Sequence, residues 1–358
     1  MYTSASSALQ TPQTRATWQE NFVTVGFGLW LIFGFFIDAY AHGNLRGNLD
    51  SFFTPWHTIL YSGFMATAFW MIWLVVRRLR QGLQGMAAVP VGYELGLVGV
   101  LVFGVAGVSD LIWHSTFGIE ANLNALRSPS HLLLFIGAFL LMTAPIRAAW
   151  HDPNSKSNPS FLEFLPNLFV ITACFGFATL MNLHFWGLTS LPIATKDLSR
   201  LASTNPMVLY NLNSFVDAGI LATNAMILST MLLLVKRWRT PFGTFAIVLG
   251  FSTLLLTVIM DTTPMIRVYF AFLAGGIIDA LIYVLKPSTT RILELRTVTV
   301  LAPIAIWGLH FLAVHLSTQL GISTELWTGS LTTTALSGLG LSVLMTAQEP
   351  PVQKSESV

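Results

Sequence analysis

The chain has 358 residues, of which 54% are apolar and only 9% are Asp, Glu, Lys or Arg. Soluble domains carry about 25% charged residues, and the mean hydropathy of +0.67 points in the same direction. This composition excludes a disordered chain, a nucleic-acid-binding protein and an ordinary soluble enzyme. The single cysteine, Cys174, excludes disulfides and thiolate metal sites within the chain. We therefore expect an all-α integral membrane protein.

Apolar runs of about 20 residues are long enough to cross a bilayer as helices. The sequence contains ten such runs, which we interpret as five repeated helical hairpins: 22–42, 55–76, 94–116, 130–149, 165–187, 209–235, 241–260, 267–285, 297–316 and 325–346. Residues 1–21 form a polar segment before the first span, and the polar residues 347–358 predict a disordered tail. We divide the spans into hairpins that carry a candidate site (22–149) and a scaffold (150–346).

Basic residues collect on one predicted side of the membrane. The two termini and the loops after the second, fourth, sixth and eighth spans hold 13 of the 18 Lys and Arg residues. Because basic residues mark the cytoplasmic side, both termini are expected on the inside of the cell (inner) membrane. Of the eight histidines, all but His151 then fall in the outer half. This asymmetry predicts that the chemistry of the protein lies near the outer face.

The first two hairpins carry the same pattern of one Asp and two His. Six residues make up the two copies: Asp38, His42 and His57 in the first, and Asp110, His114 and His131 in the second. The two Asp residues are 72 positions apart, as are His42 and His114, and the last pair of His residues is 74 positions apart. This regularity indicates an internal repeat.

The spacing within each copy predicts how its side chains lie. Asp and His at positions i and i+4 share one helix face. The second His follows Thr54-Pro55 in one copy and Ser128-Pro129 in the other. A hydroxyl residue followed by Pro is typical of a helix start, so this His lies in the first turn of the returning helix. One carboxylate and two imidazoles can then converge, and structural hydrogen bonding is the alternative to a metal site.

Two His and one carboxylate form a known ligand set for Fe(II), and imidazole also suits copper and zinc. Two copies of the pattern allow either two mononuclear sites or one dinuclear site. Glu120, in the loop that joins the third and fourth predicted spans, is a candidate general base or further ligand. Asp217 and Asp279 within later spans suit either an ion path or hydrogen bonding between helices. The same choice, between a ligand role and pairing with neighbours, applies to three later histidines: His184, His310 and His315.

The stretch from Asp110 through Trp113-His114 to Ser128-Pro129-Ser130-His131 resembles the metal-site segment of the C subunit of particulate methane and ammonia monooxygenases. The resemblance covers the two motif copies and not the rest of the chain. It implies metal ligation by Asp110, His114 and His131, and by the corresponding residues of the first copy. It also implies copper, and oxidation of small apolar or weakly polar substrates with dioxygen.

These observations lead us to expect a metal-dependent membrane oxidoreductase of monooxygenase type that uses copper or iron and acts on a small hydrophobic or lipid-like substrate. The chain has no haem, flavin or iron–sulfur motif, so its electrons would come from a separate donor protein or a quinol. The other expected partners are the lipid bilayer and, in an oligomer, further copies of the chain. The alternatives are a membrane zinc hydrolase and a metal or proton transporter.

Overall fold

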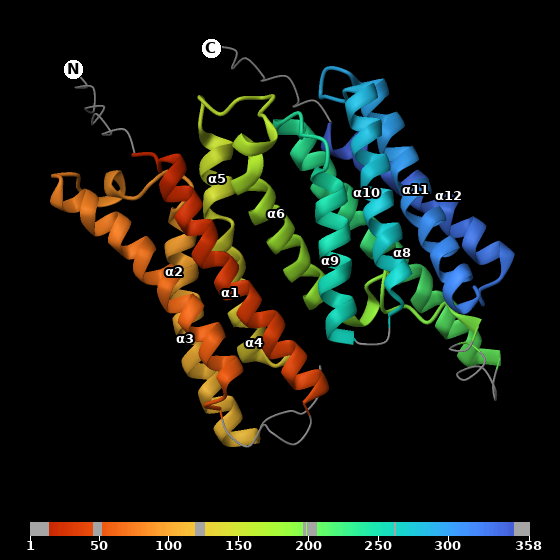
Figure 1. Ribbon diagram of the computed structural model, residues 1–358, viewed down its shortest axis with the longest axis horizontal. Helices are drawn as coiled ribbons and strands as arrows, with labels where there is room; N and C mark the ends of the chain where they lie inside the picture. The colour runs from red at the N-terminus through yellow and green to blue at the C-terminus, as the bar shows by residue number, and fades with distance from the viewer. Residues whose placement is uncertain are drawn as a thin grey trace, which may run out of the picture. The chain divides into compact units, whose positions relative to one another are not determined.

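The computed structural model describes residues 14–45, 52–118, 126–195, 198, 206–260 and 263–346. Within these ranges the regular structure consists of helices, accompanied by two isolated β-bridges (Figure 1). Eight of the helical segments described are long and apolar enough to cross a membrane. The described part of the protein is therefore all-helical, as the long apolar runs predict. The predicted disordered tail, 347–358, lies outside the described residues.

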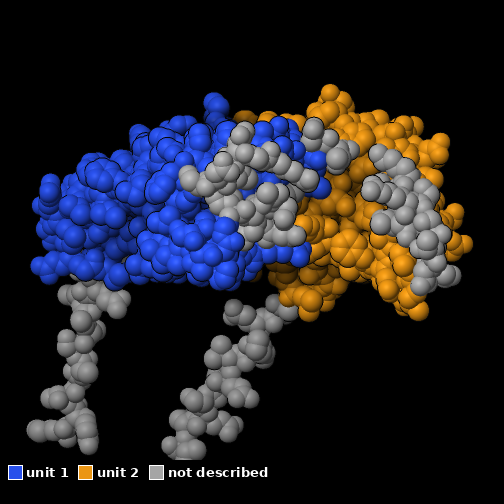
Figure 2. All heavy atoms as spheres, turned by 90° about the horizontal axis from the view of Figure 1, so that it is seen from below, with its two compact units in different colours: residues 1–156, 162–181, 258–261 blue, residues 157–161, 182–257, 262–358 orange. Residues whose placement is uncertain are grey.

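The chain divides into two compact units, which Figure 2 colours separately. The first unit holds the first two hairpins, nearly all of the sixth helix and the end of α9. Its helices are α1 (Trp18–Asn44), α2 (Pro55–Arg80), α3 (Glu94–Phe117), α4 (Pro129–Met142), α5 (Ala144–His151) and α6 (Phe161–Met181), with a short 3-10 helix η1 (Gly85–Ala88). α6 thus belongs to the same compact unit as the four preceding spans. The division into hairpins that carry the site (22–149) and a scaffold (150–346) stays a prediction.

The second unit contains the remaining helices. These are the 3-10 helix η3 (Leu183–Phe185), α8 (Pro206–Arg237), most of α9 (Thr244–Met260), α10 (Met265–Leu285), α11 (Ile292–Thr318) and α12 (Thr324–Met345). Here α10 packs against α11, α11 against α12, and α12 against α8. The α11–α12 pair is one of the predicted hairpins, whereas α10 with α11 and α12 with α8 pack across the predicted pairs. An arrangement of all spans as five repeated hairpins stays a prediction.

The structure has eight described helices that are long and apolar enough to cross a membrane, two fewer than the ten spans expected. The fourth span, Pro129–His151, is one of the eight although it is divided into α4 and α5 at Thr143. The two predicted spans not among them are α9 and α12. α9 has 17 residues and is roughly 25 Å long, which is less than the hydrocarbon thickness of about 30 Å. α12 has 22 residues, but Thr, Ser and Gly occupy much of its sequence.

The two predicted helix starts of the repeat are confirmed. α2 begins at Pro55, and the Thr54 side chain accepts a hydrogen bond from the His57 backbone N–H at 3.1 Å. α4 begins at Pro129, and the Ser128 side chain accepts one from the His131 N–H at 3.3 Å. Each cap satisfies a backbone donor that a helix start otherwise leaves without a partner. Both histidines consequently stand in the first turn of their helices.

The first two hairpins also pack in the same way. A Cβ added to Gly63 would lie 2.6 Å from the Leu31 nitrogen, and one added to Gly137 would lie 2.7 Å from the Phe103 nitrogen. The two glycines are 74 residues apart and their partners 72, the same offsets as in the repeated motif. The backbones of α1 and α2, and of α3 and α4, thus approach each other at equivalent points. α1 also contacts α4, and α2 contacts α3, so the hairpins form a four-helix arrangement.

At the opposite end of this four-helix arrangement, buried charged side chains join α1 to α2. α1 begins at Trp18, inside the polar segment 1–21, because Thr17 and Glu20 form a capping box. The Glu20 carboxylate also accepts hydrogen bonds from Arg77 and, at 2.8 Å, from Arg78 of α2. Glu20 and Arg78 are both buried. These contacts tie α1 to α2 at the end far from the Asp/His motif, so that the hairpin is held at both ends.

Candidate metal centre

All six residues of the repeated motif lie in one buried cluster. The ends of α1 and α3 carry Asp and the first His of each copy, and the first turns of α2 and α4 carry the second. None of the six residues is more than 5% exposed. Five pairs of the four imidazole rings have centroids 5.7 to 6.4 Å apart. We call this set the Asp/His cluster: Asp38, His42, His57, Asp110, His114 and His131.

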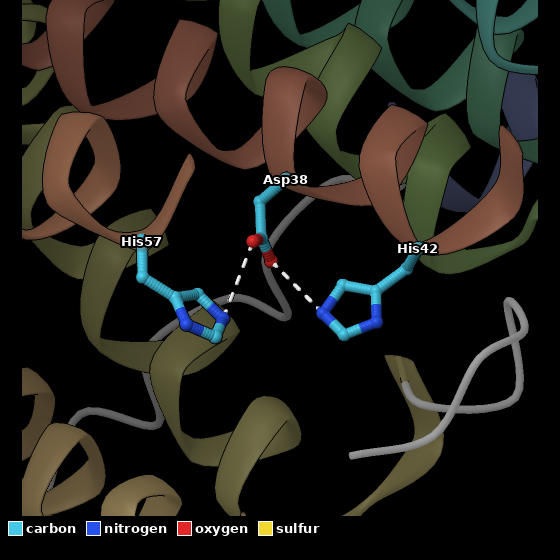
Figure 3. Close-up of side chains that lie close together, drawn as sticks. All are labelled: Asp38, His42 and His57. Carbon is cyan, nitrogen blue, oxygen red and sulfur yellow. Dashed lines mark ion pairs between the residues drawn. The ribbon is translucent and has the colours of Figure 1, made fainter. Parts of the chain in front are cut away.

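In the first copy, two imidazoles face one carboxylate from opposite sides (Figure 3). His57 Nε2 lies 3.2 Å from Asp38 Oδ1, and His42 Nε2 lies 3.8 Å from Asp38 Oδ2. The other ring nitrogen of His57, Nδ1, is 2.6 Å from the carbonyl oxygen of Phe52. Since a carbonyl only accepts hydrogen bonds, Nδ1 carries the proton in this contact. A neutral His57 therefore presents its Nε2 lone pair to the Asp38 carboxylate.

This contact brings two acceptors together. Within the part of the chain that the structure describes, Asp38 Oδ1 and His57 Nε2 have no hydrogen-bond partner. Two facing lone pairs in a buried site repel each other unless a cation, a proton or a metal ion, lies between them. Histidines that ligate metals typically donate their second ring N–H to a carbonyl or carboxylate, as His57 does to Phe52. The donor set of the first copy thus fits a metal ion.

In the second copy, the carboxylate has two hydroxyl donors in addition to the two imidazoles. Asp110 Oδ1 lies 3.5 Å from His114 Nε2 and 3.4 Å from His131 Nδ1. Asp110 also accepts two hydroxyl hydrogen bonds, both at 2.9 Å: one from Tyr61 to Oδ2 and one from Ser130 to Oδ1. The carboxylate of the second copy is therefore held by neutral donors as well as facing imidazoles.

The possible ligand atoms form one set within the first copy and one set that joins the two copies. Among the described residues, two sets of ligand atoms lie within 4.8 Å of one another: Asp38, His42 and His57 in one, and His57, Asp110 and His114 in the other. His57 belongs to both sets and joins the two hairpins. His131 belongs to neither; its Nδ1 is 2.7 Å from the Ser128 hydroxyl. A ligand role for His131 stays a prediction.

Sequence reasoning missed two contributors to the cluster, Tyr61 and Ser130. Tyr61 follows His57 by four residues, and this spacing alone places it on the same face of α2. Ser130 lies within the second copy of the motif, directly before His131. A comparison of the two copies could have found both, because corresponding positions hold Phe135 and Trp56. Glu120, the candidate general base, lies outside the described residues.

The later polar residues make ordinary contacts within the second unit. Asp279 accepts hydrogen bonds from the backbone N–H groups of Phe245 and Ala246, both at 3.0 Å, in the first turn of α9. Asp217 accepts one from the Ser330 hydroxyl at 2.9 Å. Three histidines lie in η3 and α11: His184, His310 and His315. For the two carboxyl groups, these contacts match hydrogen bonding between helices, which was one of the two alternatives.

Comparisons with family models, with curated proteins and with solved structures found no match to this chain. The resemblance to the monooxygenase C subunit therefore rests on the motif residues alone and stays a prediction.

Proposed function

We propose that this protein is a metal-dependent integral membrane oxidoreductase of monooxygenase type, acting on a small hydrophobic or lipid-like substrate. One observation supports this proposal above the others: two copies of an Asp/His/His motif, from two hairpins, meet in a single buried cluster. Ionisable side chains within membrane helices are costly and generally serve a function. Six of them in one place, none more than 5% exposed, call for a compensating charge.

The charge of the cluster favours a metal ion. In the form that ligates a metal, with both carboxylates ionised and the four imidazoles neutral, the cluster carries a net charge of −2. In the described part of the chain, the basic side chains within 4.0 Å of the Asp38 and Asp110 carboxylates are all histidines, with no Lys or Arg among them. A buried anion without a cation is strongly unfavourable, and one divalent ion or two copper(I) ions would neutralise the cluster.

The burial of the cluster favours oxidation over hydrolysis. A hydrolase must admit water to its metal, whereas dioxygen and a lipid-like substrate are apolar and reach a dry site through the membrane. Copper and iron both accept imidazole and carboxylate ligands, and when bound they supply dioxygen activation. The residues of the chain then hold the ion and exclude water. Electrons would be delivered by a donor protein or a quinol.

Metal analysis tests the proposal directly. We expect copper or iron in the detergent-purified full chain, measured by mass spectrometry, and loss of that metal in His57→Ala. His151→Ala is the matched control, because His151 is exposed at the end of α5, and it should keep the metal. Membranes with the wild-type chain should consume dioxygen with a hydrophobic substrate, and His57→Ala membranes should not. A wild-type chain that takes up no copper, iron or zinc would overturn the proposal.

A zinc hydrolase is the second candidate, because two His, one carboxylate and an open position are also a common catalytic zinc set. One zinc per chain, together with cleavage of an amide or ester, would favour it. Transport ranks third: the hydrogen bonds that Asp217 and Asp279 make within the second unit suit structural groups better than an ion path. Metal accumulation in proteoliposomes would promote it.

A further inference from the structure

The two carboxylates of the Asp/His cluster differ in the donors around them. Both oxygens of Asp110 accept a hydroxyl hydrogen bond, from Tyr61 and from Ser130, each at 2.9 Å. Among the described residues, Asp38 Oδ1 has no hydrogen-bond donor. The repeat is thus equivalent in its candidate ligands but not in what surrounds them.

This difference originates in two positions of the sequence. At the +74 offset of the repeat, Phe135 takes the place of Tyr61, and at the same offset Trp56 takes the place of Ser130. Phe135 has no hydroxyl and packs against the rings of Phe35 and Phe177, with centroids 5.2 and 4.6 Å apart. The first carboxylate therefore lacks the counterparts of both hydroxyl groups.

Tyr61 also connects the two hairpins. It stands on α2, one turn after His57, and its ring centroid is 6.1 Å from the His57 ring. Its hydroxyl nevertheless donates to Asp110 of α3. A hydrogen bond to a carboxylate stabilises its negative charge. Tyr61 therefore stabilises the charge of Asp110 on the second hairpin, whereas Asp38 Oδ1 on the first hairpin has no such donor among the described residues.

We propose that the half of the cluster formed by Asp38, His42 and His57 takes the first metal ion. Tyr61 is then a positioning residue that weakens the second half, formed by Asp110, His114 and His131, as a metal site. The proposal rests on the metal centre of the proposed function. A first divalent ion neutralises both carboxylates, so a second ion must bind to a cluster without net charge. It must also compete with the Tyr61 and Ser130 hydroxyls for the oxygens of Asp110. The two halves are then loaded in order, although the two copies of the motif carry the same residue types.

Stepwise titration separates the two halves. The full chain in detergent is stripped with a chelator and titrated with Co²⁺, and bound cobalt is measured after equilibrium dialysis. We expect Asp38→Asn to lower the affinity for the first ion by more than about 100-fold, beyond the range for losing an outer-shell partner, because Asp38 is proposed as a direct ligand. Asp110→Asn removes one negative charge but no ligand of the first ion, so it should lower the affinity for the first ion much less than Asp38→Asn does, and it should abolish binding of the second. Should Asp38→Asn fail to fold, His42→Gln tests the same half with the same expectation.

Tyr61→Phe tests the positioning role. Removing a hydrogen bond to a charged group should raise the affinity for the second ion by about tenfold and leave the first unchanged. Tyr40→Phe, the same change at an exposed position of α1, should alter neither affinity.

Two results would overturn the inference alone while leaving the metal centre intact. One is an equal loss of the first ion in Asp38→Asn and Asp110→Asn, which would indicate a single symmetric site. The other is weaker metal binding in Tyr61→Phe, which would make Tyr61 a supporting partner of the second half. A wild-type chain that binds neither cobalt nor copper, iron or zinc would overturn the proposed function as well.

Discussion

Buried carboxyl groups of the two units, Asp279 in the second and Asp38 in the first, differ in the donors around them. In the second unit, Asn224 is fully buried and its amide donates to the Thr334 carbonyl and the Ser337 hydroxyl, while its oxygen accepts from Trp307. The Asp279 carboxylate caps the backbone of α9. In the first unit, Asp38 Oδ1 has no hydrogen-bond donor among the described residues and lies 3.2 Å from His57 Nε2. A buried polar residue inside a membrane helix therefore does not by itself indicate a site. Asp38 is distinguished by an oxygen without a donor that lies beside several other candidate ligands.

The largest expected effect is the loss of metal affinity when a candidate ligand of the first unit, His57, is replaced. His57 belongs to both sets of ligand atoms, so His57→Ala should lower metal affinity by more than about 100-fold, beyond the range seen for outer-shell partners. A chelator should then lower the melting temperature of the wild type, because bound metal stabilises the folded state, but not that of His57→Ala. Differential scanning calorimetry in detergent measures both. Equal chelator sensitivity in the two proteins would contradict a role for His57.

Asp279→Ala should do the reverse. It leaves the Phe245 and Ala246 N–H groups of α9 without their acceptor, which should cost about 3 kcal/mol of unfolding free energy. The metal content should stay at the wild-type value, because Asp279 lies in the second unit. Urea unfolding in mixed micelles, with metal analysis of the same samples, checks both expectations. A loss of metal in this variant would break the distinction between the two units.

Gly63→Ala and Gly137→Ala test the equivalence of the first two hairpins. Each added methyl group would meet backbone atoms of the facing helix, at 2.6 and 2.7 Å. We expect a loss of about 2 kcal/mol in each case, typical of overpacking, with a partial loss of metal as the helix ends move. Gly26→Ala, where a Cβ meets nothing within 4 Å, is the control. Very different losses for Gly63 and Gly137 would argue against equivalent packing.

The smallest expected effect concerns the helix cap of the first copy. Thr54→Ala removes the acceptor of the His57 N–H and should cost about 1 kcal/mol. Thr54→Ser keeps the hydroxyl and should be close to wild type. Thermal unfolding resolves the difference between the two variants. A cost in Thr54→Ser as large as in Thr54→Ala would show that the methyl group, not the cap, matters.

The sequence by itself determined the features that depend on local spacing. The apolar runs indicated the helices, the Thr-Pro and Ser-Pro pairs marked the starts of α2 and α4, and the four-residue spacing put Asp and His on one helix face. These features follow from backbone hydrogen bonding and helix periodicity, which act over a few residues. For the same reason, Asp38 with His42, and Asp110 with His114, could be predicted as pairs.

Only the tertiary structure decided how the two copies meet. Sequence reasoning assigned His131 to the second group of ligands, whereas the packing of the hairpins puts His57 within reach of both carboxylates. It also sends the Tyr61 hydroxyl from the first hairpin to Asp110 of the second. Such contacts depend on how closely the helices approach at Gly63 and Gly137, and on the angles that this approach allows. Repeat spacing cannot show which side chains then face each other, because it records positions along one helix and not the distance between two.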